Sequence, residues 1–140
     1  MSLTEHQVGL LRSSFARLGD ALEPHSLYFY EALFRHAPEV RPLFREDLAG
    51  QGMRFMATLG IILADMRDPA ANDARFGELG ALHATLGIRA EHFAPMEEAL
   101  VDTLRNALDD DFTAELEQAW RAAFGHVSAQ MIVKGAIAEH

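Results

Sequence analysis

The chain has 140 residues, of which 49% are apolar, so it is long enough for one domain with a sizeable core. Its 12 Lys and Arg against 21 Asp and Glu give a formal charge of −9, which argues against nucleic-acid binding. It contains no cysteine, and this excludes disulfides, thiolate metal ligands and thiol catalysis.

The N-terminus lacks the basic and apolar regions of a signal peptide. The longest apolar run, Phe55–Ala64, is too short to span a bilayer. We therefore expect a cytoplasmic protein with neither a membrane nor a nucleic acid as its partner.

Helical periodicity begins near the N-terminus. Thr4 and Gln7 have the spacing of a capping box, which predicts a first helix. Its buried stripe would be Val8, Leu11, Phe15 and Leu18. A break is expected at Gly19-Asp20, and Pro24 suits the first turn of a second helix. Leu27, Tyr30 and Phe34 would lie along one side of that helix, which would end at Ala37-Pro38.

The middle of the chain predicts a turn-rich connection over Pro42–Gly50 and a third helix over Gln51–Met66, ended by Asp68-Pro69. The third helix would turn inward Phe55, Met56, Leu59, Ile62, Leu63 and Met66. A fourth helix contains His83 and ends at Gly87, which can adopt the left-handed cap conformation.

Two further helices complete the pattern. The fifth has an apolar stripe formed by Met96, Ala99, Leu100, Thr103, Leu104, Ala107 and Leu108. Thr113 is expected to cap the last helix, which would bury Leu116, Trp120, Ala123, Val127 and Met131. No alternating strand pattern, repeat or linker interrupts this series. The sequence therefore predicts one all-α domain over 1–140, with six or more helices packed at varied angles.

His83 is the most informative single residue. It falls with Leu79, Leu82 and Leu86 on one stripe of its helix. A neutral imidazole on such a face can ligate a metal in a dry pocket, although many such histidines are only hydrogen-bonded core residues. The other histidines lie near helix ends or on polar faces.

Familiar catalytic motifs are missing. There is no HExxH sequence and no serine in a nucleophile elbow. Gly50-Gln51-Gly52 begins like a phosphate loop, but no strand precedes it, so it is better explained as the entry to a helix.

The order and spacing of several residues along the chain are more specific than any single motif. The chain runs from Tyr30-Glu-Ala-Leu-Phe34 through Ala37-Pro38 and Leu43-Phe44 to Gln51 at the start of an apolar helix. His83, Trp120 and Phe124 follow. Over nearly its whole length the chain resembles a bacterial globin, most of all the single-domain haemoglobins of the flavohaemoglobin type. The resemblance implies a globin fold of six to eight helices around haem b.

The resemblance also implies individual roles. His83 matches the proximal ligand of the haem iron, whereas Tyr30 and Gln51 match the distal pair that contacts a bound gas. Arg54 resembles the basic residue that pairs with a haem propionate. Haem is a flat, largely apolar disc, and its walls would be Phe44, Phe55, Leu59, Leu79, Leu82, Ile88, Phe93 and Met96.

Two departures from that family type matter. Its members place a tyrosine and a glutamate behind the proximal histidine, and the matching positions here are Phe93 and Gly135. We therefore expect His83 to give its second N–H to a backbone carbonyl, which argues against strong peroxidase-like activity. The chain also has no room for a flavin and nicotinamide domain, so any turnover would need an external reductase.

The resemblance implies reversible binding of dioxygen, and of other diatomics such as nitric oxide and carbon monoxide. The same pocket would serve nitric oxide dioxygenation, and a gas sensor acting on a partner chain is a third possibility. A haem-free adaptor is disfavoured, because His83, Phe44, Tyr30 and Gln51 occur together.

Overall fold

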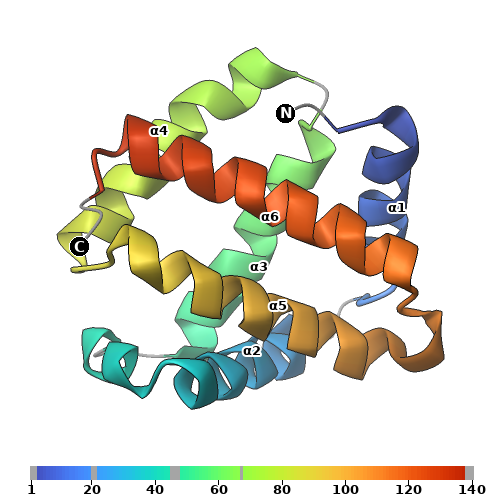
Figure 1. Ribbon diagram of the computed structural model, residues 1–140, viewed down its shortest axis with the longest axis horizontal. Coiled ribbons are helices and arrows are strands. Elements are labelled where there is room, and N and C mark those ends of the chain that lie inside the picture. The colour runs from blue at the N-terminus through green and yellow to red at the C-terminus, as the bar shows by residue number, and fades with distance from the viewer. Residues whose placement is uncertain (1–2, 20–21, 45–47, 67, 138–140) are drawn as a thin grey trace.

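The structure is a computed structural model that describes residues 3–19, 22–44, 48–66 and 68–137. These residues form six α-helices and three short 3-10 helices (Figure 1). The α-helices are α1 (Glu5–Ala16), α2 (Leu22–His36), α3 (Leu48–Ala64), α4 (Pro69–Thr85), α5 (Phe93–Leu108) and α6 (Ala114–Lys134). The 3-10 helices are η1 (Pro38–Leu43), η2 (Ala90–His92) and η3 (Asp109–Asp111). The predicted all-α class is confirmed.

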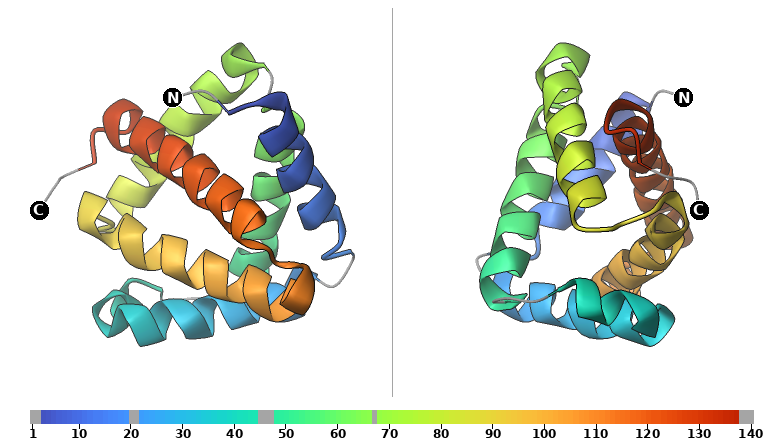
Figure 2. Two further views of the ribbon diagram at one scale, coloured as in Figure 1. Left: turned by 45° about the vertical axis from the view of Figure 1, so that its right-hand side comes forward. Right: turned by 90° about the vertical axis from the view of Figure 1, so that its left-hand side faces the viewer.

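The helices cross at wide angles rather than lying in a parallel bundle. Seen from the side, α3 and α4 form one flank, α5 and α6 form the other, and α2 runs beneath both (Figure 2). Helix α2 packs against both α3 and α5, and α1 packs against α3 and α6. Among the described helices, α4 packs extensively only against α6.

Several predicted helix ends are confirmed. The Thr4 hydroxyl accepts a hydrogen bond from the Gln7 amide, and the Gln7 side chain completes the capping box. Thr113 caps α6 in the same way, by accepting from the amide of Leu116. Gly87 follows the end of α4 with φ of 89°, a left-handed conformation that glycine adopts without strain.

The predicted ends of the third helix are wrong. Helix α3 begins at Leu48 and ends at Ala64, whereas the prediction gave 51 and 66. Asp68 and Pro69 do not stop it; they begin the next helix. The Asp68 carboxylate accepts from the amide of Ala71, and Pro69, which lacks an N–H, occupies the first position of α4. Residues 45–47 of the expected connection lie outside the described residues.

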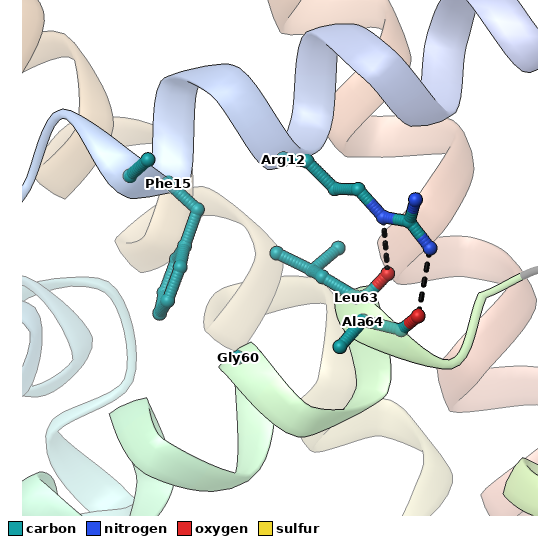
Figure 3. Close-up of a pocket in the computed structure, with 6 residues that line it drawn as sticks. Arg12, Phe15, Gly60, Leu63 and Ala64 are labelled. Atoms are coloured by element: carbon teal, nitrogen blue, oxygen red, sulfur yellow. Dashed lines mark hydrogen bonds between the residues drawn. The ribbon is translucent and has the colours of Figure 1, made fainter.

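Buried polar contacts join α1 to its neighbours. Trp120 of α6 is 1% exposed, and its indole Nε1 donates to the Ser14 hydroxyl at 3.0 Å. Arg12 donates to the carbonyl oxygens of Leu63 and Ala64 at 2.9 and 2.7 Å, which satisfies two acceptors at the end of α3 (Figure 3). Arg12 and Phe15 also line a shallow hollow of about 410 Å³ between α1 and α3.

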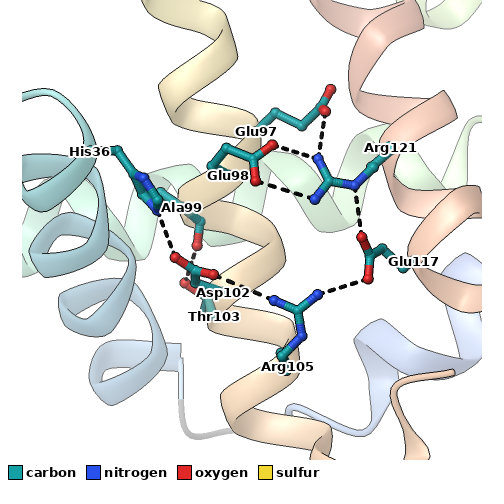
Figure 4. A network of polar contacts seen from close by, with 9 residues as sticks. All are labelled: His36, Glu97, Glu98, Ala99, Asp102, Thr103, Arg105, Glu117 and Arg121. Carbon is teal, nitrogen blue, oxygen red and sulfur yellow. Dashed lines mark hydrogen bonds and ion pairs between the residues drawn. The ribbon is translucent and has the colours of Figure 1, made fainter. Parts of the chain in front are cut away.

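A network of charges links α2, α5 and α6 (Figure 4). His36 contacts Asp102 at 2.7 Å, and Arg105 joins Asp102 to Glu117. From α6, Arg121 binds three carboxylates, those of Glu97, Glu98 and Glu117. None of the described helices is both long enough and apolar enough to cross a bilayer.

Most of the predicted core is buried, but one stripe is wrong. Leu82 and Leu86 of α4 are 56% and 39% exposed, and Leu27 of α2 is 38% exposed. Helix α4 meets α6 through Gly77 and Gly80 instead. Glycine lets two backbones approach more closely than leucine can, so the helix turns its small residues, rather than its leucine stripe, toward its neighbour.

Candidate functional site

His83 lies in the last turn of α4 and is half-buried. Its Nδ1 atom is 2.6 Å from the carbonyl oxygen of Leu79, one turn earlier. A carbonyl can only accept, so this contact places a proton on Nδ1 and leaves the lone pair on Nε2. The expectation that His83 donates its second N–H to a backbone carbonyl is confirmed. Nε2 is thereby prepared to ligate a metal.

The residues packed around His83 are apolar. Phe93, the first residue of α5, is buried, and its ring centroid is 6.0 Å from that of the imidazole. Phe124 of α6 packs against Phe93 at 6.5 Å. Ile88 and Met96 are also buried, and the Ile88 amide donates to the His83 carbonyl. Two of the predicted wall residues, Phe93 and Ile88, therefore contact His83 directly.

Tyr30 of α2 is 4% exposed and sits among aromatic rings. Its ring makes edge contacts with Phe29 at 5.4 Å and Phe44 at 5.3 Å, and stacks on Phe34 at 6.1 Å. No hydrogen bond joins its hydroxyl to any described residue. Burial raises the pKa of Tyr30 to about 12, opposed by the positive charge of Arg54. The phenol therefore stays protonated near neutral pH. Its hydroxyl can donate to a ligand without first giving up a hydrogen bond to a described residue.

Helices α2 and α3 cross closely at Gly52, the residue that follows Gln51. A Cβ atom on Gly52 would lie 2.5 Å from Cβ of Ser26 and 3.2 Å from Cε2 of Tyr30. Real structures do not show the first distance, so only glycine fits at this crossing. Gln51 is the adjacent residue in α3 and is half-buried, and its amide makes no hydrogen bond to a described residue.

The apolar residues of the predicted walls are distributed unevenly. Phe55 stacks on Phe29 at 4.8 Å with an interplanar angle of 25°. Leu59 and Leu79 are partly buried against the core, whereas Leu82 is exposed. Arg54 is exposed and forms no ion pair with a described residue. The roles of these residues toward haem stay predictions.

The predicted site thus divides into two groups. Tyr30, Gln51, Phe44 and Phe55 gather where α2 meets α3, and His83 stands on α4 beside Phe93. Among the hydrogen bonds and ring contacts of the described residues, none joins the two groups. The arrangement offers two hydrogen-bond donors on one side and one metal ligand on the other.

Sequence reasoning missed three residues that shape the site: Phe29, Ser26 and Gly52. Phe29 is buried between Tyr30 and Phe55, although it lies beside the stripe that the 3.6-residue period selected. Ser26 and Gly52 are the two small residues at the crossing. A small residue in each of two apolar helices is the only signal that could have marked them.

A histidine with a free Nε2 lone pair, apolar residues and two unengaged donors, carried on crossing α-helices, fit the class of haem-binding globin folds. Comparison with known proteins agrees, since the model of the globin family matches residues 27–131. The chain belongs to the globin family. Membership implies a haem cofactor, and the donor set described above fits one.

Similar proteins include plant and bacterial members. The chain is 28% identical to a leghemoglobin of Medicago sativa, covering 89% of this chain and 92% of that protein. It is 27% identical to a flavohemoprotein of Vibrio cholerae, covering 87% of this chain but 32% of that protein.

A solved structure is also similar. The engineered carbene transferase RmaNOD, a candidate nitric oxide dioxygenase of Rhodothermus marinus, superimposes with a TM-score of 0.86 at 28% identity. The match covers 96% of this chain and 94% of that one. The expected globin fold and the resemblance to the haem part of flavohaemoglobins are confirmed.

Proposed function

We propose that this chain is a single globin domain over 1–140 that holds haem b and reversibly binds dioxygen and other diatomic gases. The observation that carries the proposal is the unengaged Tyr30 hydroxyl, held in an aromatic cluster near the crossing of α2 and α3 that Gln51 adjoins. Bound haem would supply the iron atom that takes up the gas.

His83 would hold the iron from the proximal side through Nε2. Its hydrogen bond to Leu79 supports this role, because it fixes both the tautomer and the orientation of the ring. The walls would come from the apolar residues of the two groups, and Arg54 would pair with a propionate.

Tyr30 and Gln51 would act as donors to the gas. A dioxygen ligand carries partial negative charge, so a hydroxyl and an amide N–H both stabilise it. A hydrogen bond to a charged acceptor contributes about 1.5–3 kcal/mol. Because neither side chain is bound to a described residue, little protein interaction is lost when the gas arrives. The pair therefore favours tight binding and slow release.

Nitric oxide dioxygenation with an external reductase is the second candidate. The similarity to flavohemoproteins and to RmaNOD favours it. The chain spans about a third of the length of the flavohemoprotein from Vibrio cholerae, at 32%, so the activity of the whole relative is a proposal here. We further propose a cytoplasmic location, where a reductase and both gases are within reach.

Absorption spectra of the purified protein would test the haem assignment. Reduced protein with and without carbon monoxide should show the paired band shifts of a histidine-ligated b-type haem. A protein that takes up no haem under reconstitution would rule out the proposal. Consumption of nitric oxide at a catalytic rate, with dioxygen and a supplied flavin reductase, would favour the second candidate over a carrier.

A further inference from the structure

Helix α4 is positioned by one close contact. Among the described helices, α4 packs extensively only against α6. The two backbones approach each other closely at Gly80 and Gly135. A Cβ atom on Gly80 would lie 2.3 Å from the Met131 carbonyl oxygen and 2.9 Å from Cα of Gly135. A Cβ atom on Gly135 would lie 2.3 Å from the carbonyl carbon of Gly80. No residue larger than glycine fits on either side.

This contact lies next to the group that orients His83, one peptide unit further along α4. The carbonyl oxygen that accepts from His83 Nδ1 belongs to the peptide unit joining Leu79 to Gly80. The atoms nearest to a Cβ on Gly135 are the carbonyl carbon and Cα of Gly80 and the amide nitrogen of Ala81. The chain end of α6 therefore contacts the peptide unit that follows the one directing the imidazole, and the two units share Cα of Gly80. Gly80 itself lies three residues before His83, less than one helical turn away.

The end of α6 is itself held in place. Lys134 forms an ion pair with Asp73 of α4. Beyond Gly135, the amide of Ile137 donates to the carbonyl of Ile132 at 3.0 Å, and the Ile137 side chain is buried. A shift of α4 away from α6 would break the Lys134–Asp73 pair, whereas the Ile137 hydrogen bond fixes the end of α6 on its own helix. The position of the glycine pair is therefore passed on to α4 and to His83.

We propose that Gly80 and Gly135 are positioning residues for the proximal histidine, and that their backbone contact sets the place and orientation of the His83 imidazole. The contact also bars every side chain from position 135, so the acceptor for Nδ1 remains a neutral carbonyl. A neutral acceptor polarises the imidazole less than a carboxylate does. This inference rests on the proposed role of His83 as the axial ligand.

The test compares glycines that have no room for a Cβ atom with glycines of the same two helices that do have room. Gly80→Ala and Gly135→Ala introduce the clashing Cβ atoms. Gly77→Ala is the control in α4, where the nearest atom lies 4.0 Å away, and Gly125→Ala is the control in α6, where nothing lies within 4 Å. Resonance Raman spectra of the reduced, gas-free proteins report the iron–imidazole stretching band, and transfer to an apoglobin acceptor reports haem loss.

We expect Gly80→Ala and Gly135→Ala to shift the band and to speed haem loss by roughly 10–100-fold, the usual effect of altering groups that orient a ligand. Both controls should match the wild type. Wild-type behaviour of Gly80→Ala and Gly135→Ala would overturn the positioning role alone. If the wild type itself shows no histidine-ligated haem, the proposed function fails together with the inference.

A second background separates positioning from general damage. In His83→Gly protein supplied with free imidazole, the axial ligand is no longer tethered to α4. Adding Gly80→Ala should then leave the band unchanged, while circular dichroism checks that both proteins keep their helices. An equal shift in the tethered and untethered backgrounds would show that Gly80 acts on the pocket as a whole, and would contradict the inference.

Discussion

The Nδ1 atom of His83 and the carbonyl oxygen of Leu79 lie 2.6 Å apart within one turn of α4. The acceptor is a backbone carbonyl of the same helix, so the orientation of the imidazole depends on the path of α4 alone. That helix depends in turn on its contact with α6. The surroundings of His83 are therefore set by backbone geometry, and those of Tyr30 by the packing of aromatic side chains.

Replacement of His83 by alanine should abolish normal haem retention, because no other described residue on α4 offers a ring nitrogen. Added imidazole should restore part of the reduced spectrum by occupying the vacated space. His6→Ala, an exposed histidine paired with Glu115, serves as the control and should keep the wild-type spectrum. A wild-type spectrum for His83→Ala would show that the axial assignment is wrong.

Haem should carry much of the stability of the fold. A ligand that binds only the folded state adds about 4 kcal/mol when present at a thousand times its Kd. Apoprotein should therefore melt well below holoprotein, as differential scanning calorimetry would show. Hydrogen exchange should be fastest over residues 74–87, since α4 packs mainly on α6. Equal melting temperatures would argue against a pocket organised by haem.

Tyr30 and Gln51 should slow the release of dioxygen. Tyr30→Phe should speed release by about tenfold or more, because it removes a hydrogen bond of about 1.5–3 kcal/mol. Gln51→Leu should act in the same direction. Carbon monoxide is less polar when bound, so its release should change much less. Stopped-flow displacement measures both rates, and Tyr28→Phe in the same helix is the matched control. Parallel shifts for the two gases would contradict the hydrogen-bond account.

The crossing of α2 and α3 should tolerate no side chain at position 52. Gly52→Ala should lower the free energy of unfolding by about 1–3 kcal/mol, the usual cost of overpacking. Gly9→Ala, which has nothing within 4 Å, should cost nothing. Because the added Cβ would lie 2.5 Å from both Cβ and Oγ of Ser26, Ser26→Gly should relieve Gly52→Ala in urea unfolding more than Ser26→Ala does. Equal effects of the two second substitutions would exclude this explanation.

The network around Arg121 should make stability fall in acid. Hydrogen bonds from Arg121 hold the pKa of Glu98 and of Glu117 below the usual 4.5. Their folded pKa values are lowered, so their contribution is present above pH 4.5 and is lost as the pH falls through the folded values.

Arg121→Gln should therefore reduce stability at pH 7 by about 1 kcal/mol or less, since these carboxylates are partly exposed. The difference from the wild type should vanish in strong acid. Arg17→Gln, which breaks one exposed pair with Asp111, should change the acid limb of urea unfolding less. A difference for Arg121→Gln that is constant with pH would rule out the ionic origin.

Much of this protein follows from its sequence alone. The capping residues Thr4, Gln7 and Thr113 and the left-handed Gly87 are local features, because each depends on hydrogen bonds within a few residues. The number of helices, the all-α class and the globin resemblance need only the order of such signals. The carbonyl acceptor of His83 was also predictable, since Phe93 and Gly135 offer no polar alternative.

Only the tertiary structure decided which face of each helix meets its neighbour. The 3.6-residue period shows that Leu79, Leu82 and Leu86 share a face, but it cannot show that α4 presents Gly77 and Gly80 to α6. The same holds for Ser26 against Gly52, and for Phe29 between Tyr30 and Phe55. Close approach of two backbones depends on pairs of small residues far apart in the chain, and a single helix contains no information about its partner.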